Sequence, residues 1–75
     1  MKFEVGKKYI VKLGRKHGGS LVEAEYLDER KEENAHSVKA VKVIQWKGDK
    51  GWLYLMEKYG SLCFIVDGSQ ILREA

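Results

Sequence analysis

The side chains best suited to catalysis or metal binding are few in this chain and lie far apart. They are His17, His36 and Cys63, a lone cysteine inside an apolar segment. A structural zinc site needs four ligands, usually in close pairs, so these residues predict no metal site. A cysteine nucleophile needs a nearby base and a lowered pKa, whereas an apolar strand predicts a buried, inert thiol. We therefore expect no enzyme site and no cofactor.

Two other groups of polar residues bear on chemistry. Glu23 and Glu25 share one strand face, but catalytic carboxylates need a cleft that separates their pKa values, and none is indicated. His36 opens a predicted strand and is expected at its solvent-exposed end. The turn at residues 15–19, Arg-Lys-His-Gly-Gly, offers basic side chains and backbone amides to a phosphate. The same composition also fits a solvated hairpin turn, because no helix follows it.

Lysines and aromatic residues together suggest a binding face. In single-strand-binding barrels, lysines neutralise phosphates and aromatic rings stack on bases. The alternative is that the tryptophans stabilise the core or a hairpin while the lysines solvate exposed strand faces. The candidate residues for binding nucleic acid or a protein partner are Lys8, Lys12, Arg15, Lys16, Lys39, Lys42, Trp46, Trp52 and Tyr54.

Charge is segregated along the sequence although its sum is only +3. Residues 1–20 carry a net charge of +5, residues 21–35 carry −4, and the remainder carries +2. The acidic segment at residues 28–33 would repel nucleic acid and could dock on a basic partner, or it is a solvated loop.

Length and composition predict one small soluble domain. The chain has 75 residues, 44% of them hydrophobic, and its one cysteine cannot form an intrachain disulfide. No apolar run approaches 18 residues and no basic-then-apolar leader is present, so we expect neither a membrane span nor a secretory signal. An unpaired cysteine then predicts a cytoplasmic location. Because so small a core gives a thin stability margin, a homo-oligomer is plausible.

Short runs of apolar, β-branched and aromatic residues alternate with turn signals every eight to twelve residues. This spacing predicts an all-β domain, a single small antiparallel barrel of five to six strands spanning residues 1–75. A hairpin turn is predicted at residues 47–51, so that Trp46 and Trp52 face each other across the ladder. A loop, with at most one helical turn, is predicted at 28–34. Strands are predicted at residues 7–13, 20–27, 38–46, 52–57, 62–66 and 71–74.

Two segments carry a resemblance to a known superfold. Residues 6–11 (Gly-Lys-Lys-Tyr-Ile-Val) look like a glycine-led first strand, and residues 64–72 (Phe-Ile-Val-Asp-Gly-Ser-Gln-Ile-Leu) look like a strand, a one-turn connector and a closing strand. In this order the parts resemble the Src-homology-3-like barrels. The resemblance implies a fold and says little about function, because such superfolds host many functions.

A narrower resemblance involves residues 11–13, residues 19–25 with Asn34, and residues 65–71. These look like the first and second sequence motifs of the Sm-like RNA-binding rings. That family has a basic group before the glycine of the second motif, whereas this chain has Asp67 before Gly68. The resemblance implies a ring-forming barrel that binds RNA.

The function expected from the sequence is therefore binding without catalysis. The first expectation is a protein-interaction adaptor or inhibitor, of the kind found in mobile elements. The alternative is a nucleic-acid-binding barrel that uses the lysine face. Exposed tryptophans lining a lysine groove would favour nucleic acid, and buried tryptophans beside an apolar, unpaired strand edge would favour a protein partner.

Overall fold

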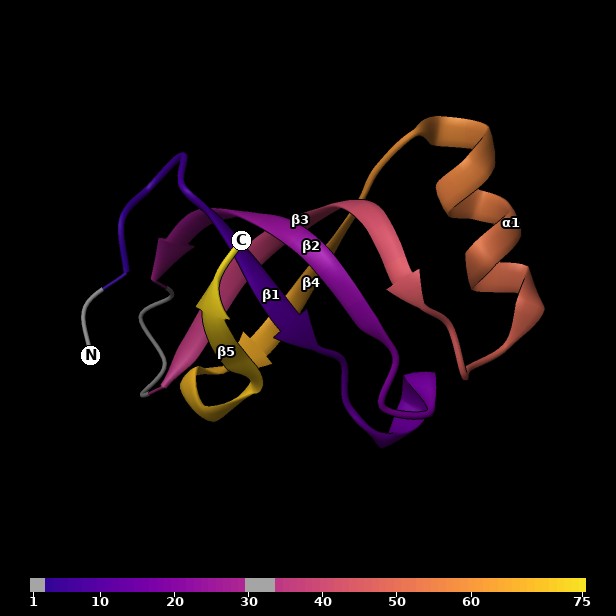
Figure 1. The fold of residues 1–75 in the computed structure, drawn as a ribbon, viewed down its shortest axis with the longest axis horizontal. Coiled ribbons are helices and arrows are strands. Elements are labelled where there is room, and N and C mark those ends of the chain that lie inside the picture. Colours follow the sequence, from indigo (N-terminus) through magenta and orange to yellow (C-terminus); the bar gives the residue numbers. More distant parts are fainter. Residues whose placement is uncertain (1–2, 30–33) are drawn as a thin grey trace.

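Five strands and one α-helix form the part of the chain that the structure describes, residues 3–29 and 34–75 of a computed structural model (Figure 1). The predicted antiparallel β domain is confirmed, and five of the six predicted strands occur close to their predicted positions. Residues 30–33, and with them most of the predicted acidic loop, lie outside the described residues. The elements are β1 (Lys8–Lys12), β2 (Leu21–Glu29), β3 (Ala35–Gln45), α1 (Lys50–Tyr59), β4 (Leu62–Asp67) and β5 (Ile71–Glu74).

The strands form one sheet in the order β4-β3-β2-β1-β5, with every neighbouring pair antiparallel. The long strands β2 and β3 make its centre, and the register of their pairing shifts at three points. Among the described residues, β4 and β5 are the two edges and do not pair with each other. Closure of the sheet into a barrel is therefore not confirmed.

The core follows from the two-residue period of the strands. In β2, Val22, Ala24 and Tyr26 are buried, while Glu23 and Glu25 between them lie half-buried on the opposite face. The same alternation places residues of every strand on one inner face, and α1 adds one methionine. The buried hydrophobic cluster consists of Tyr9, Val11, Leu13, Val22, Ala24, Tyr26, Val38, Ala40, Met56, Phe64, Val66 and Ile71.

The sequence prediction was wrong at residues 47–57, where a hairpin turn and a strand were expected. The chain instead forms α1, a ten-residue helix at one end of the long axis of the molecule (Figure 1). Asp49 begins the helix by accepting a hydrogen bond from the backbone N–H of Gly51 at 2.6 Å. Gly60 ends it in the left-handed conformation, with φ of 79°, and its N–H donates to the carbonyl of Met56.

Two short 3-10 helices complete the connections. The first, Arg15–His17, lies in the predicted turn between β1 and β2. The second, Gly68–Gln70, joins β4 to β5 where a break was predicted, and a capping box holds it: the Asp67 carboxylate accepts from the N–H of Ser69, and the Gln70 side chain accepts from the N–H of Asp67.

Candidate functional site

Three of the predicted binding lysines lie on the outer face of the sheet, but acidic residues lie between them. Glu25 of β2 is the register partner of both Lys8 in β1 and Lys39 in β3. Glu23 of β2 is likewise opposite Lys42 in β3. Opposite charges directly across a ladder attract each other and lower the local potential. The structure therefore does not bring Lys8, Lys39 and Lys42 together as a continuous basic surface.

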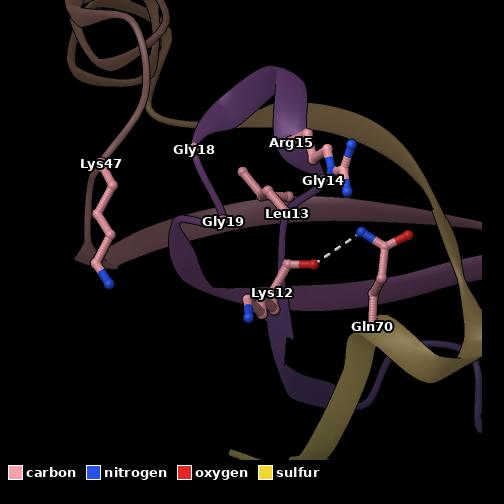
Figure 2. A pocket seen from close by; sticks show the side chains of 8 residues that line it. All are labelled: Lys12, Leu13, Gly14, Arg15, Gly18, Gly19, Lys47 and Gln70. Carbon is pink, nitrogen blue, oxygen red and sulfur yellow. Dashed lines mark hydrogen bonds between the residues drawn. The ribbon is translucent and has the colours of Figure 1, made fainter.

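A second group of basic side chains surrounds an open depression of about 570 Å³ at one end of β1 (Figure 2). Lys12 at the end of β1 and Arg15 in the first 3-10 helix were among the predicted binding residues, and the structure brings them to the same depression. Lys16, on the same turn, is exposed and does not line it. Two residues outside the set of candidate residues also reach it: Lys47 from the segment after β3 and Gln70 from the second 3-10 helix.

The two tryptophans are half-buried and pack against the core rather than standing free as stacking platforms. The Trp46 Nε1–H donates to the backbone carbonyl of Asp49 at 2.9 Å. Trp52 lies in the first turn of α1, so the predicted pairing of Trp46 with Trp52 across a hairpin is wrong. The third predicted aromatic residue, Tyr54, is 60% exposed on α1.

His17, the last residue of the first 3-10 helix, packs against both tryptophans. Its ring is only 9% exposed and lies edge-on to Trp52, with centroids 5.0 Å apart, and edge-on to Phe64 at 5.1 Å. Trp46 is 6.2 Å away. Burial, and then the charge of Lys16, lower the pKa of His17 below its ordinary 6.5, which favours the neutral ring. Among the described residues its buried Nδ1 has no hydrogen-bond partner, so His17 serves as a packing residue.

The turn between β1 and β2 is locked against the segment that follows β3. A Cβ on Gly18, at φ of 65°, would lie 2.4 Å from the Lys47 carbonyl oxygen, and one on Gly48 would lie 2.7 Å from that of His17. Only glycine permits this backbone approach. Ser20 completes the contact, because its hydroxyl donates to the carbonyl of His17 and accepts from the N–H of Lys47, both at 2.7 Å.

His36 and Cys63 both lie where the sequence analysis did not expect them. His36 is buried rather than at a solvent-exposed end, with its Nδ1 2.8 Å from the Tyr26 hydroxyl and its ring edge-on to Phe3. Phe3, in the N-terminal segment, packs against the His36 ring and helps to bury it. Cys63 is exposed rather than buried, because the inward positions of β4 belong to its neighbour Phe64 and to Val66.

Helix α1 presents an apolar surface. The sequence did not predict this surface, because residues 52–57 were expected to form a strand. Within α1, whose residues are all described, Met56 alone is buried. Tyr59 is 63% exposed, comparable with Tyr54. An open depression of about 330 Å³ is lined by Leu53 and Met56 of α1 and by residues 41–43 of β3. Another of about 360 Å³ is lined by Trp52, Tyr54 and Leu55.

Within residues 3–29 and 34–75, no three His, Cys, Asp or Glu side chains gather as they would around a metal ion. No helix in this part of the chain has the length and apolar character needed to cross a membrane. No protein-family model, curated protein or solved structure matches this chain.

Proposed function

We propose that this chain is a non-catalytic protein-interaction module, a small adaptor or inhibitor that contacts its partner through α1. The observation that carries the proposal is the unbroken apolar run from Trp52 to Met56 on a helix of which only one described residue is buried. Five successive apolar residues put apolar side chains on every side of that part of the helix, and helix surface of this kind normally lies against other protein. Exposed apolar surface of this kind marks interaction sites.

The partner surface is proposed to be an apolar segment that also carries acidic side chains. Lys50, Tyr54 and Lys58 lie four positions apart along α1, and all three are exposed. Residues at this spacing form one stripe on a helix. The ammonium group of Lys58 lies 5.4 Å from the centre of the Tyr59 ring, which adds a second aromatic residue beside the stripe. Tyrosines flanked by lysines fit a partner that presents apolar and carboxylate side chains together.

The fold is proposed to be an open relative of the Src-homology-3-like barrels. In support, β5 returns to pair with β1, and one 3-10 turn joins β4 to β5. Self-association is proposed through the edge of β4, where Ile65 is 53% exposed beside Cys63. An exposed free thiol suits a reducing compartment, which supports a cytoplasmic location.

The alternative proposal is a nucleic-acid-binding domain, and one observation supports it. Lys12, Arg15 and Lys47 surround a depression with no acidic side chain in its lining. Against it, Glu23 and Glu25 interrupt the lysines of the sheet, and Trp46 and Trp52 pack on the core.

The experiment that tests the α1 surface is selection of random peptides on the whole immobilised chain, followed by calorimetric titration of the enriched peptides. We expect enrichment of peptides with apolar and acidic residues. Tyr54→Ala should weaken binding of these peptides about tenfold, since interface tyrosines are common hot spots. Lys58→Glu should weaken it about as much, because the new carboxylate would repel the acidic side chains of the peptides. Ile65→Ser, exposed on β4, is the matched control.

Equal affinity of the wild type, Tyr54→Ala and Lys58→Glu would exclude α1 as the contact surface. The alternative is tested by fluorescence polarisation with labelled single-stranded DNA, single-stranded RNA and duplex DNA at low and physiological salt. Binding that weakens steeply with salt and falls further in Lys12→Glu or Arg15→Glu would replace the protein-binding proposal with the nucleic-acid one.

A further inference from the structure

The basic depression beside β1 lies outside the surface proposed for protein binding. Three parts of the chain that are distant in sequence supply its cations: Lys12 ends β1, Arg15 opens the first 3-10 helix, and Lys47 follows β3 (Figure 2). The depression measures about 570 Å³, and no acidic side chain lines it. A volume of this size lies within the range of sites for small ligands.

The three cations have no anionic partner in the part of the chain that the structure describes. The ion pair found there joins Lys7 to Glu74, at 2.6 Å, and involves none of them. Like charges around one depression repel each other, and a bound anion would remove that repulsion. The lysines of the outer sheet face differ, because Glu23 and Glu25 already lie opposite them.

The walls of the depression are held in place without a ligand. The contact of Gly18 with Lys47 fixes the first turn against the segment after β3. On the other side, the Gln70 side chain donates to the backbone carbonyl of Lys12 at 2.9 Å, which ties the second 3-10 helix to β1 (Figure 2). A site whose walls are already ordered loses little entropy when a ligand binds.

We propose that this depression binds a multiply charged phosphate anion, namely a pyrophosphate group, either free or as part of a nucleoside diphosphate. Three cations around one depression match an anion with more than one negative charge. The Arg15 guanidinium can donate two parallel hydrogen bonds to phosphate oxygens, and the two lysines add point charges. A Cβ on Gly19 would lie 3.3 Å from Cε of Lys12, so the glycine leaves room for that side chain.

The test is calorimetric titration of the whole chain with inorganic phosphate, pyrophosphate and ADP at low salt. We expect pyrophosphate to bind more tightly than inorganic phosphate. Arg15→Gln and Lys47→Gln should each weaken pyrophosphate binding about tenfold, since each removes a charge-assisted contact. Lys58→Gln is the matched control, because it removes an exposed lysine on α1, away from the depression.

The comparison of ligands identifies the source of the phosphate. Tighter binding of ADP than of pyrophosphate, lost in Arg15→Gln, supports a nucleotide, and equal binding of the two supports the free anion. The proposal is overturned if pyrophosphate and ADP give no binding at low salt, or if Lys58→Gln weakens binding as much as Arg15→Gln. It is also overturned if only a single-stranded oligonucleotide, added as a fourth ligand, binds in an Arg15-dependent way.

Discussion

Buried histidines in this molecule pack in two different ways. His36 shares a hydrogen bond with the Tyr26 hydroxyl, whereas the Nδ1 of His17 has no such partner among the described residues. A buried ring packed against Trp52 and Phe64, with no partner for its Nδ1 among the described residues, tolerates the neutral form and disfavours the charged one. His17 therefore couples the stability of the fold to pH.

The pH dependence has a defined direction. Because burial lowers the pKa of His17 in the folded state, the unfolded chain takes up a proton first as pH falls below about 6.5. Stability is then lost as pH falls from about 6.5 to the lower pKa of the folded state. We expect His17→Phe, which keeps an aromatic ring, to flatten this slope in urea denaturation at pH 5, 6 and 8.

A companion substitution separates packing from protonation. His17→Ala should lower the free energy of unfolding by about 2–3 kcal/mol at pH 8, because it leaves a cavity beside Trp52 and Phe64. The role assigned to His17 fails if His17→Phe keeps the wild-type slope, or if His17→Ala is as stable as the wild type at pH 8.

At the scale of elements, the helix depends on its first and last residues. Asp49→Ala should lower the free energy of unfolding by about 1 kcal/mol and reduce helical circular dichroism, because the first turn loses its side-chain acceptor. Asp49→Asn retains an acceptor oxygen and is the control. Identical urea denaturation curves for the two variants would exclude a capping role.

The strands could be predicted from the sequence because their burial alternates with period two, as in β2 with Val22, Ala24 and Tyr26. The helix could not, because residues 52–56 are apolar at every position and carry neither a strand period nor a helix period. The available signals were its ends, Asp49 as an N-cap and Gly60 as a terminating glycine.

The candidate sites were predictable only in part, because they depend on how distant strands pair. Lys12 and Arg15 are close in sequence, so a shared turn was foreseeable. Lys47 and Gln70 reach the same depression only through the pairing of distant strands. The intervening positions of Glu23 and Glu25 likewise depend on register, which a single sequence does not reveal.

At the scale of the whole molecule, the sheet leaves the edge of β4 unpaired among the described strands. We expect concentration-dependent self-association through this edge, measured by sedimentation velocity. Ile65→Lys should abolish it, because a charge on an exposed edge opposes pairing. Tyr54→Lys, on α1, is the control. A wild type that stays monomeric at high micromolar concentration would exclude this mode of association.

The contact between Gly18 and Gly48 has a consequence for the order of folding. These residues are 30 positions apart in the sequence, and we expect their backbones to meet only after the intervening β2 and β3 have paired. Closing so long a loop carries an entropic cost, which places the contact late on the folding route. The depression lined by Lys12, Arg15 and Lys47 depends on this contact, so it would be absent from partly folded chains. A ligand that binds there would stabilise the native state and slow its unfolding.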